Sequence, residues 1–208
     1  MTRAAILAAA GLVLAACSKG IDDNFGVEET LGDADCENLE ETRCLLPFPS
    51  DRFLDTSGAQ PSVRIPEAAM PVARNGTVLS PASMYERDGF GIGSPVLFHL
   101  AGAVVDRAPF DIEASTQPGY PTLLVDADTG ELLPHWLETD HFTPDAPEQF
   151  LTIRPAVPLP RGHRVVVGVR DLTDASGAVV AAPRGFAALR DEEASEVRGL
   201  HARRAHYE

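Results

Sequence analysis

Ile153-Arg-Pro-Ala-Val-Pro-Leu-Pro-Arg-Gly-His-Arg-Val-Val-Val-Gly-Val-Arg170 is the stretch of this 208-residue chain that decides its fold. Its first residues complete a segment, from Phe150 to Arg154, in which Leu151 and Ile153 fall on one face of a strand. Three prolines and a glycine follow, which exclude a continuous helix. The valine-rich residues after them favour a second strand. The stretch therefore predicts two β-strands joined by a turn.

Further segments of strand length lie on its N-terminal side, at Pro95–Leu100, Thr122–Val125 and Leu132–Glu138. Asp126-Ala-Asp-Thr-Gly130 separates the last two and combines turn residues with a glycine suited to positive φ, which predicts a β-hairpin. The chain also contains 17 prolines, which fit loops and sheet edges better than helices. We therefore predict a mainly β fold, with an antiparallel β-sandwich over residues 95–190.

The N-terminus has the pattern of an export signal. Arg3 precedes an apolar run from Ala4 to Ala16, which is too short to cross a ~30 Å hydrocarbon core but has the size of a signal-peptide core. The run ends in Leu14-Ala-Ala-Cys17, which resembles the bacterial lipobox. That resemblance implies removal of residues 1–16 and attachment of lipid to Cys17. Because Ser18 and not Asp follows the cysteine, the resemblance to Gram-negative lipoproteins implies the outer membrane; an ordinary secretory signal is the alternative.

Charge and cysteine content narrow the function classes. The chain has 17 basic and 31 acidic residues, a formal net charge of −14, which argues against binding of nucleic acid or anionic lipid headgroups. Residues 17–35 are acidic and polar and predict a flexible tether. Cys36 and Cys44 remain as an even pair in an oxidising compartment, so we predict a disulfide, which would stabilise by ~2.6 kcal/mol in the chain-entropy model.

The remaining segments differ from the strand region. Residues 36–94 are rich in proline and loop-forming residues. In residues 191–208, acidic side chains come early and arginines late, as in a helix, and an apolar stripe follows helical spacing: Ala194, Val197, Leu200 and Arg204. This predicts a C-terminal helix. Because no cap follows the pattern at Glu208, we expect the helix to continue in a longer chain.

Two sets of residues carry a resemblance to known families. Ile153–Arg170, with Leu172-Thr-Asp-Ala-Ser-Gly177 and Phe186 after it, resembles bacterial Ig-like modules of the S-layer type. Leu45–Phe53 and Arg87-Asp-Gly-Phe90 resemble the N-terminal domain of envelope lipoproteins similar to bacterial virulence-factor lipases. The resemblance implies an Ig-like sandwich that precedes an α/β-hydrolase domain, and that hydrolase region is missing from these 208 residues.

The sequence contains no motif that predicts catalysis. A hydrolase of that class needs Gly-x-Ser-x-Gly, and the stretch around Ser94 has Ile92 and Val96 where the glycines should stand. We therefore expect a loop that enters a strand at Val96. No catalytic residue is assigned.

Metal ligation is also not predicted, with one alternative kept open. His135 and His141 lie six residues apart without a His-Glu-x-x-His pattern, so we interpret them as polar residues beside aromatic ones. Asp126–Glu131 resembles the start of a calcium loop, but it lacks the glutamate at position 12 and its glycine comes one place early. Structural calcium remains the alternative to a plain turn. It would need further ligands brought together by the fold, such as Asp88, Asp106 and Asp111.

Together these observations support two hypotheses. The first is a membrane-anchored, non-catalytic, β-rich N-terminal module that supports or spaces a hydrolase domain. The second is a stand-alone binding or adhesion module of the cell envelope. In both, the partners are the membrane, through the lipid on Cys17, and either a C-terminal hydrolase domain or another envelope component.

Overall fold

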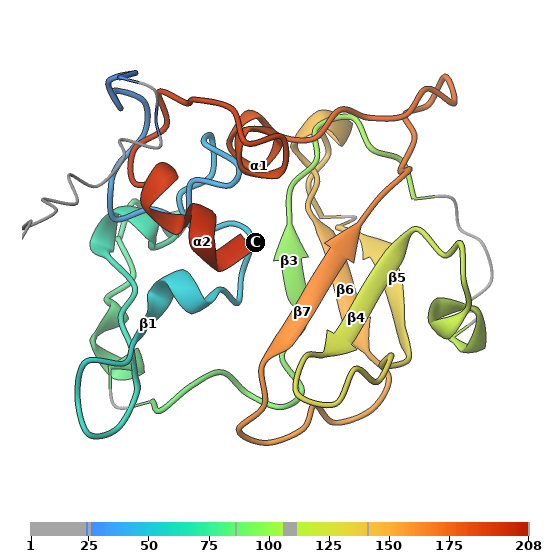
Figure 1. Cartoon of the computed structure of the whole chain (residues 1–208), viewed down its shortest axis with the longest axis horizontal. Helices are drawn as coiled ribbons and strands as arrows, with labels where there is room; N and C mark the ends of the chain where they lie inside the picture. Colours follow the sequence, from blue (N-terminus) through green and yellow to red (C-terminus); the bar gives the residue numbers. More distant parts are fainter. Residues whose placement is uncertain (1–23, 25, 86, 106–111, 141, 208) are drawn as a thin grey trace, which may run out of the picture.

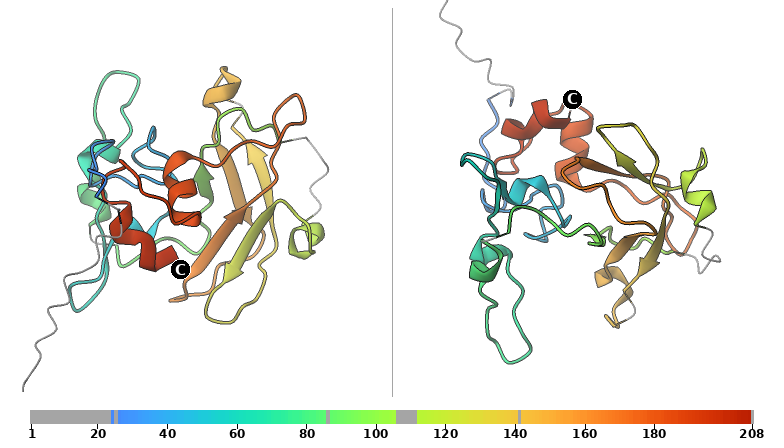
Figure 2. Two further views of the ribbon diagram at one scale, coloured as in Figure 1. Left: turned by 45° about the horizontal axis from the view of Figure 1, so that its top comes forward. Right: turned by 90° about the horizontal axis from the view of Figure 1, so that it is seen from below.

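The computed structural model describes Asn24 and residues 26–85, 87–105, 112–140 and 142–207. The signal segment 1–16 and the lipidation residue Cys17 lie outside this part. The described chain forms two lobes that lie side by side (Figure 1). One lobe joins the N-terminal part of the chain to the C-terminal helices, and the other contains the longer strands (Figure 2).

The strand lobe contains two antiparallel sheets. One sheet has three strands in the order β3-β6-β5, and the other pairs β4 with β7. The bounds of these strands are β3 Val96–Phe98, β4 Thr122–Asp126, β5 His135–Thr139, β6 Leu151–Pro155 and β7 Val165–Val169. Leu124 and Ile153 are fully buried, one from each sheet. The mainly β, antiparallel prediction is confirmed at this level.

The predicted strands are present, but strands that follow one another in the sequence do not always pair with each other. β6 and β7 follow one another along the chain, yet they belong to different sheets. The turn after β4 has the geometry of a β-hairpin turn, because Asp126 N–H donates to the Glu131 carbonyl at 2.9 Å and Gly130 adopts φ +77°. After Leu133, whose N–H bonds to the Leu124 carbonyl at 2.8 Å, the chain departs and β5 pairs with β6 instead. The expected hairpin is therefore limited to the residues nearest the turn.

The N-terminal lobe is loop-rich, as expected for residues 36–94. A buried cluster of Phe53, Val63, Ile65 and Ala69 forms its core. Its two short strands, β1 Leu54–Asp55 and β2 Ser62–Val63, pair antiparallel. Single 3-10 turns occur throughout the chain: η1 Asp51–Phe53, η2 Glu67–Ala69, η3 Pro81–Met84, η4 Glu113–Thr116 and η5 Ala146–Glu148. Phe48 joins this lobe to the strand lobe through backbone hydrogen bonds with Leu97 on β3.

The C-terminal helix predicted over 191–208 is wrong in its extent. α1 spans Arg184–Arg190, and the helical conformation returns at η6 His201–Arg203 and α2 Arg204–Tyr207. Between them, Glu192 and Gly199 adopt φ values of +56° and +70°, which an α-helix cannot contain. Among the described residues, no helix is both long and apolar enough to cross a membrane.

The tether predicted over 17–35 is also wrong for the residues that the structure describes. Asn24 is buried and exchanges two hydrogen bonds with the backbone of Ser195, at 2.9 and 3.0 Å. Leu31 forms a parallel bridge with Val197. The Glu29 carboxylate accepts the backbone N–H of Gly199 at 2.7 Å. The side chains of Asn24 and Glu29 form hydrogen bonds with backbone groups of the C-terminal segment. The described part of the N-terminal segment therefore packs against the C-terminal segment, although its composition suggested a solvated linker.

Candidate functional site

The Cys36–Cys44 disulfide predicted from the cysteine count is present. It closes a short loop that lies against α1, where Phe186 N–H donates to the Leu39 carbonyl at 3.0 Å. α1 approaches this loop closely because Gly185 has no side chain to separate the two backbones. The disulfide therefore supports the contact between the N-terminal and C-terminal segments.

A buried ion pair lies beside the disulfide. Glu37 is fully buried, and its carboxylate accepts hydrogen bonds from Arg203 and from the Ser50 hydroxyl. Burial raises the pKa of Glu37, although the nearby Arg203 guanidinium acts in the opposite direction. Arg203 also donates to the Tyr207 hydroxyl at 2.9 Å. Burial raises the pKa of Tyr207 to about 12.

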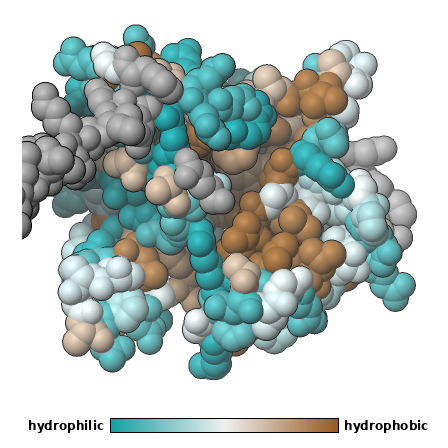
Figure 3. Space-filling view, in the orientation of Figure 1, coloured by the Kyte–Doolittle hydropathy of each residue, from teal (hydrophilic) through white to brown (hydrophobic). Residues whose placement is uncertain are grey.

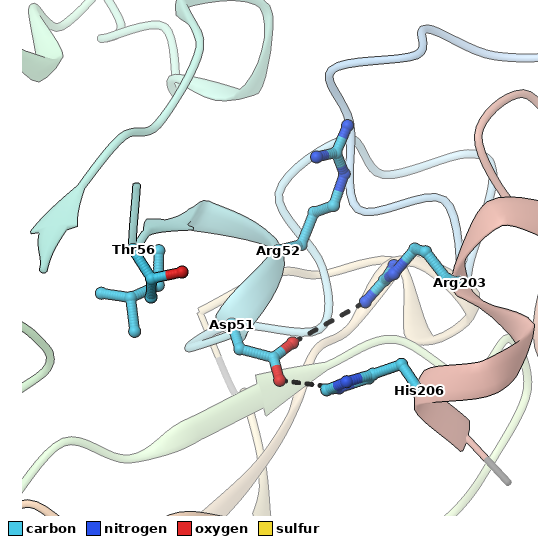
Figure 4. A pocket seen from close by; sticks show the side chains of 6 residues that line it. Asp51, Arg52, Thr56, Arg203 and His206 are labelled. Atoms are coloured by element: carbon cyan, nitrogen blue, oxygen red, sulfur yellow. Dashed lines mark ion pairs between the residues drawn. The ribbon is translucent and has the colours of Figure 1, made fainter. Parts of the chain in front are cut away.

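A polar cleft of about 400 Å³ has Arg203 of this pair in its lining (Figure 4). Asp51 lies between two C-terminal side chains, with its carboxylate 2.7 Å from His206 Nε2 and 3.9 Å from Arg203 Nη2. The cleft is lined by Asp51, Arg52, Leu54, Thr56, Arg203 and His206. Fixed charges of both signs suit this cleft to a small polar or charged group.

His206 is shared between the two lobes. Its Nε2 lies 2.9 Å from Arg164 Nη2 on the strand lobe as well as 2.7 Å from Asp51. Arginine can only donate and a carboxylate can only accept, so a single ring nitrogen cannot bond to both at once. His206 Nε2 therefore lies within reach of a partner on each lobe but bonds to one of them at a time.

A second polar cluster lies at the end of β4. Asp126, Asp128 and His163 each offer an atom that could bind a metal ion, and these three atoms all lie within 4.8 Å of one another. His163 Nδ1 is 2.8 Å from Asp126 Oδ2, and the Asp128 carboxylate accepts the Arg164 N–H at 2.8 Å. Burial opposes ionisation of Asp126, but the bonds from His163 and the backbone leave its pKa lowered. The hydrogen bond that His163 donates to the Asp126 carboxylate raises the pKa of His163.

His135 has a structural role in the core. It is fully buried on β5, where its Nδ1 contacts the Leu133 carbonyl and its Nε2 contacts the Thr122 hydroxyl of β4, both at 2.8 Å. Because a carbonyl only accepts, Nδ1 carries the proton and Nε2 accepts from the hydroxyl. Burial lowers the pKa of His135. The ring thus links the two sheets in its neutral form.

The outer face of the β4–β7 sheet is apolar and open to solvent. In the antiparallel register Leu123 faces Gly168 and Val125 faces Val166, so these side chains share one face. Leu123 is 39% exposed and Val166 is 41% exposed, and the neighbouring Leu132 is also exposed. Figure 3 shows this hydrophobic region over β4 and β7. Exposed apolar surface of this kind is typical of interaction sites.

The other sequence candidates are not brought together. Ser94 lies in a loop, and β3 begins at Val96 as expected. Within the described ranges, Asp88 does not join the one group of side chains that could hold a metal ion. Cys17, Asp106, Asp111 and His141 lie outside the described residues.

Comparison with models of protein families, with curated protein sequences and with solved structures finds no significant match for this chain. The site must therefore be interpreted from its own geometry. Sequence reasoning missed Arg203 and Glu37, which lie 166 positions apart, and it missed His163 as a neighbour of Asp126. The resemblance of Asp126–Glu131 to the start of a calcium loop and a histidine two residues before the valine-rich strand were the available signals for the second cluster.

Proposed function

We propose that this chain is a lipid-anchored envelope lipoprotein whose β-rich body is a non-catalytic module of a larger lipase-like α/β-hydrolase lipoprotein. The observation that carries the proposal is Leu14-Ala-Ala-Cys17 directly after an apolar run of signal-peptide length. The Cys36–Cys44 disulfide supports it, because disulfides persist in oxidising compartments outside the cytosol. The body would support or space the hydrolase domain at the outer membrane.

The proposal includes an Ig-like β-sandwich in the strand lobe. Two observations favour it: β6 and β7 belong to different antiparallel sheets, and the His135–Thr122 hydrogen bond joins strands of those two sheets. In a sandwich, consecutive strands commonly cross from one sheet to the other in this way. The exposed face of β4 and β7 would then be the surface nearest to a supported domain.

The anchor is tested by expressing the whole chain in a Gram-negative host and analysing its N-terminal peptide by mass spectrometry. We expect cleavage before Cys17 and a mass gain of a diacylglycerol and a further acyl chain, with the protein in the outer-membrane fraction. Two acyl chains or more are needed for stable attachment. Cys17→Ser should abolish the modification, and Ser18→Asp should move the protein to the inner membrane.

Recovery of the wild-type chain in the soluble fraction with an unmodified thiol at Cys17 would contradict the anchor. The non-catalytic assignment is tested separately with short acyl esters. We expect no turnover by the purified chain above that of buffer. Turnover that co-purifies with the chain and disappears in Ser94→Ala would overturn the assignment.

A stand-alone envelope binding module is the second candidate. The contacts between the N-terminal and C-terminal segments of the described chain favour it. The N-terminal segment is fastened to the C-terminal one through Asn24–Ser195, Leu31–Val197 and Glu37–Arg203. A stand-alone module predicts that the Cys17→Ser chain is monomeric and unfolds in one cooperative transition. A supporting module predicts self-association through the apolar β4–β7 face, relieved by Val166→Thr. Size-exclusion chromatography and denaturant unfolding distinguish the two.

A further inference from the structure

We propose that Asp126, Asp128 and His163 form a binding site for a divalent transition-metal ion of the zinc class. This inference is independent of the anchor and of any hydrolase domain. The three ligand groups come from two chain segments, the end of β4 with the turn after it and the loop before β7. They meet because the β4–β7 register places Asp126 opposite Val165, two residues after the histidine.

The distances allow one ion to contact all three groups. A tetrahedral ion with metal–ligand bonds of about 2.1 Å separates its ligand atoms by about 3.4 Å. Here His163 Nδ1 and Asp126 Oδ2 are 2.8 Å apart, and the three groups offer ligand atoms that all lie within 4.8 Å of one another. Small side-chain rotations would therefore complete the site. His163 and Asp128 have room to make them, because both are exposed while Asp126 is buried.

The ligand set selects the class of metal. Calcium prefers six to eight oxygen ligands, whereas an imidazole together with carboxylates suits zinc, cobalt or nickel. Three protein ligands with one side open to water is the arrangement of an accessible zinc site. The sequence hypothesis of structural calcium used the same turn, and the addition of His163 changes the expected ion.

The surrounding charges also favour a cation. The nearest arginine, Arg164, gives its backbone N–H to Asp128, while its guanidinium lies 2.9 Å from His206. The two carboxylates place negative charge beside His163, and that charge attracts a metal ion. A bound ion would fasten the turn at 126–131 to the loop before β7.

The test uses the untagged whole chain with Cys17→Ser in detergent, so that the two remaining cysteines are held in the disulfide. Co²⁺ and Zn²⁺ are titrated by visible absorption and calorimetry, and Ca²⁺ is titrated in parallel. We expect one Zn²⁺ or Co²⁺ per chain, a Co²⁺ spectrum of low coordination number, and a higher melting temperature with Zn²⁺.

His163→Gln and Asp128→Asn should each weaken binding at least about tenfold, since even the loss of an outer-shell partner costs 10–100-fold. Both side chains are exposed, so these variants should fold. His201→Gln is the matched control, because its side chain is 39% exposed, close to the 37% of His163, and its Nδ1 also lies beside a carboxylate, that of Glu29. Failure of the wild type to bind Zn²⁺ or Co²⁺ would overturn the proposal. So would binding that survives His163→Gln, or a preference for Ca²⁺.

Discussion

Gly185→Ala is the substitution that most directly tests how α1 is held against the disulfide loop. A Cβ atom built on Gly185 would lie 2.2 Å from the Asn38 carbonyl oxygen and 2.9 Å from the Leu39 carbonyl oxygen. Carbon–oxygen contacts normally begin at about 3.3 Å, so the helix or the loop must move by about 1 Å. Both obstacles are backbone atoms, which cannot rotate away as a side chain can.

The size of the effect follows from what that movement disrupts. Forcing an extra methyl group into a packed site typically costs 1–3 kcal/mol. The movement also breaks the hydrogen bond from Phe186 N–H to the Leu39 carbonyl, for which the net loss is about 1 kcal/mol. Alanine improves helix propensity by about the same amount in the opposite direction. We therefore expect Gly185→Ala to reduce the free energy of unfolding by about 2 kcal/mol.

The assay is equilibrium unfolding in urea of the oxidised whole chain carrying Cys17→Ser, followed by circular dichroism. Gly93→Ala is the matched control, because a Cβ at Gly93 meets no atom within 4 Å and its φ is not in the left-handed region. The control should change stability by no more than about 0.5 kcal/mol. Equal unfolding free energies for the two variants would refute the close approach of α1 to residues 38–39.

Three further predictions concern stability. Replacing both Cys36 and Cys44 by alanine should lower the free energy of unfolding in urea by ~2.6 kcal/mol, and no change would mean that the disulfide does not restrict the unfolded chain. Asn24→Ala should cost about 2 kcal/mol through two lost buried hydrogen bonds, whereas Asn75→Ala on an exposed turn should cost much less. The pKa of His135 is lower in the folded chain than in the unfolded chain, so as the pH falls His135 is protonated more readily in the unfolded chain. The free energy of unfolding should therefore fall as the pH drops below 6.5. His135→Gln should remove this pH dependence in unfolding experiments at pH 7.5 and 5.5.

The sequence predicted individual strands and turns better than their partners. The alternation before Arg154, the valine run after His163 and the glycine at 130 are local signals, and each lies where expected. Strand pairing depends on how whole sheets pack, which no short window contains. For this reason the assignment of β6 and β7 to different sheets could not be derived from their sequence alone.

The C-terminal region shows the limit of periodicity. Val197, Leu200 and Arg204 follow helical spacing, and all three are buried. The burial was therefore predictable from the pattern. The conformation was not, because Val197 lies outside both helices and is buried by its contact with the N-terminal segment. Tertiary contacts overrode the local propensity here.

The roles of individual acidic residues could not be read from composition. The chain has a net charge of −14, and the structure shows that Glu29, Glu37 and Asp126 join segments that are 170, 166 and 37 positions apart. The pKa values of Glu29 and Asp126 are lowered in the fold, whereas that of Glu37 is raised. The lowered values of Glu29 and Asp126 stabilise the fold above the unfolded values of 4.5 and 3.8, and that stability is lost as the pH falls. The raised value of Glu37 favours the protonated fold and opposes the ionised one, so its contribution is lost as the pH rises above 4.5. The contact between the N-terminal and C-terminal segments therefore loses the contribution of Glu29 as the pH falls and that of Glu37 as the pH rises, and the Arg203 guanidinium offsets part of the cost of the buried Glu37 charge.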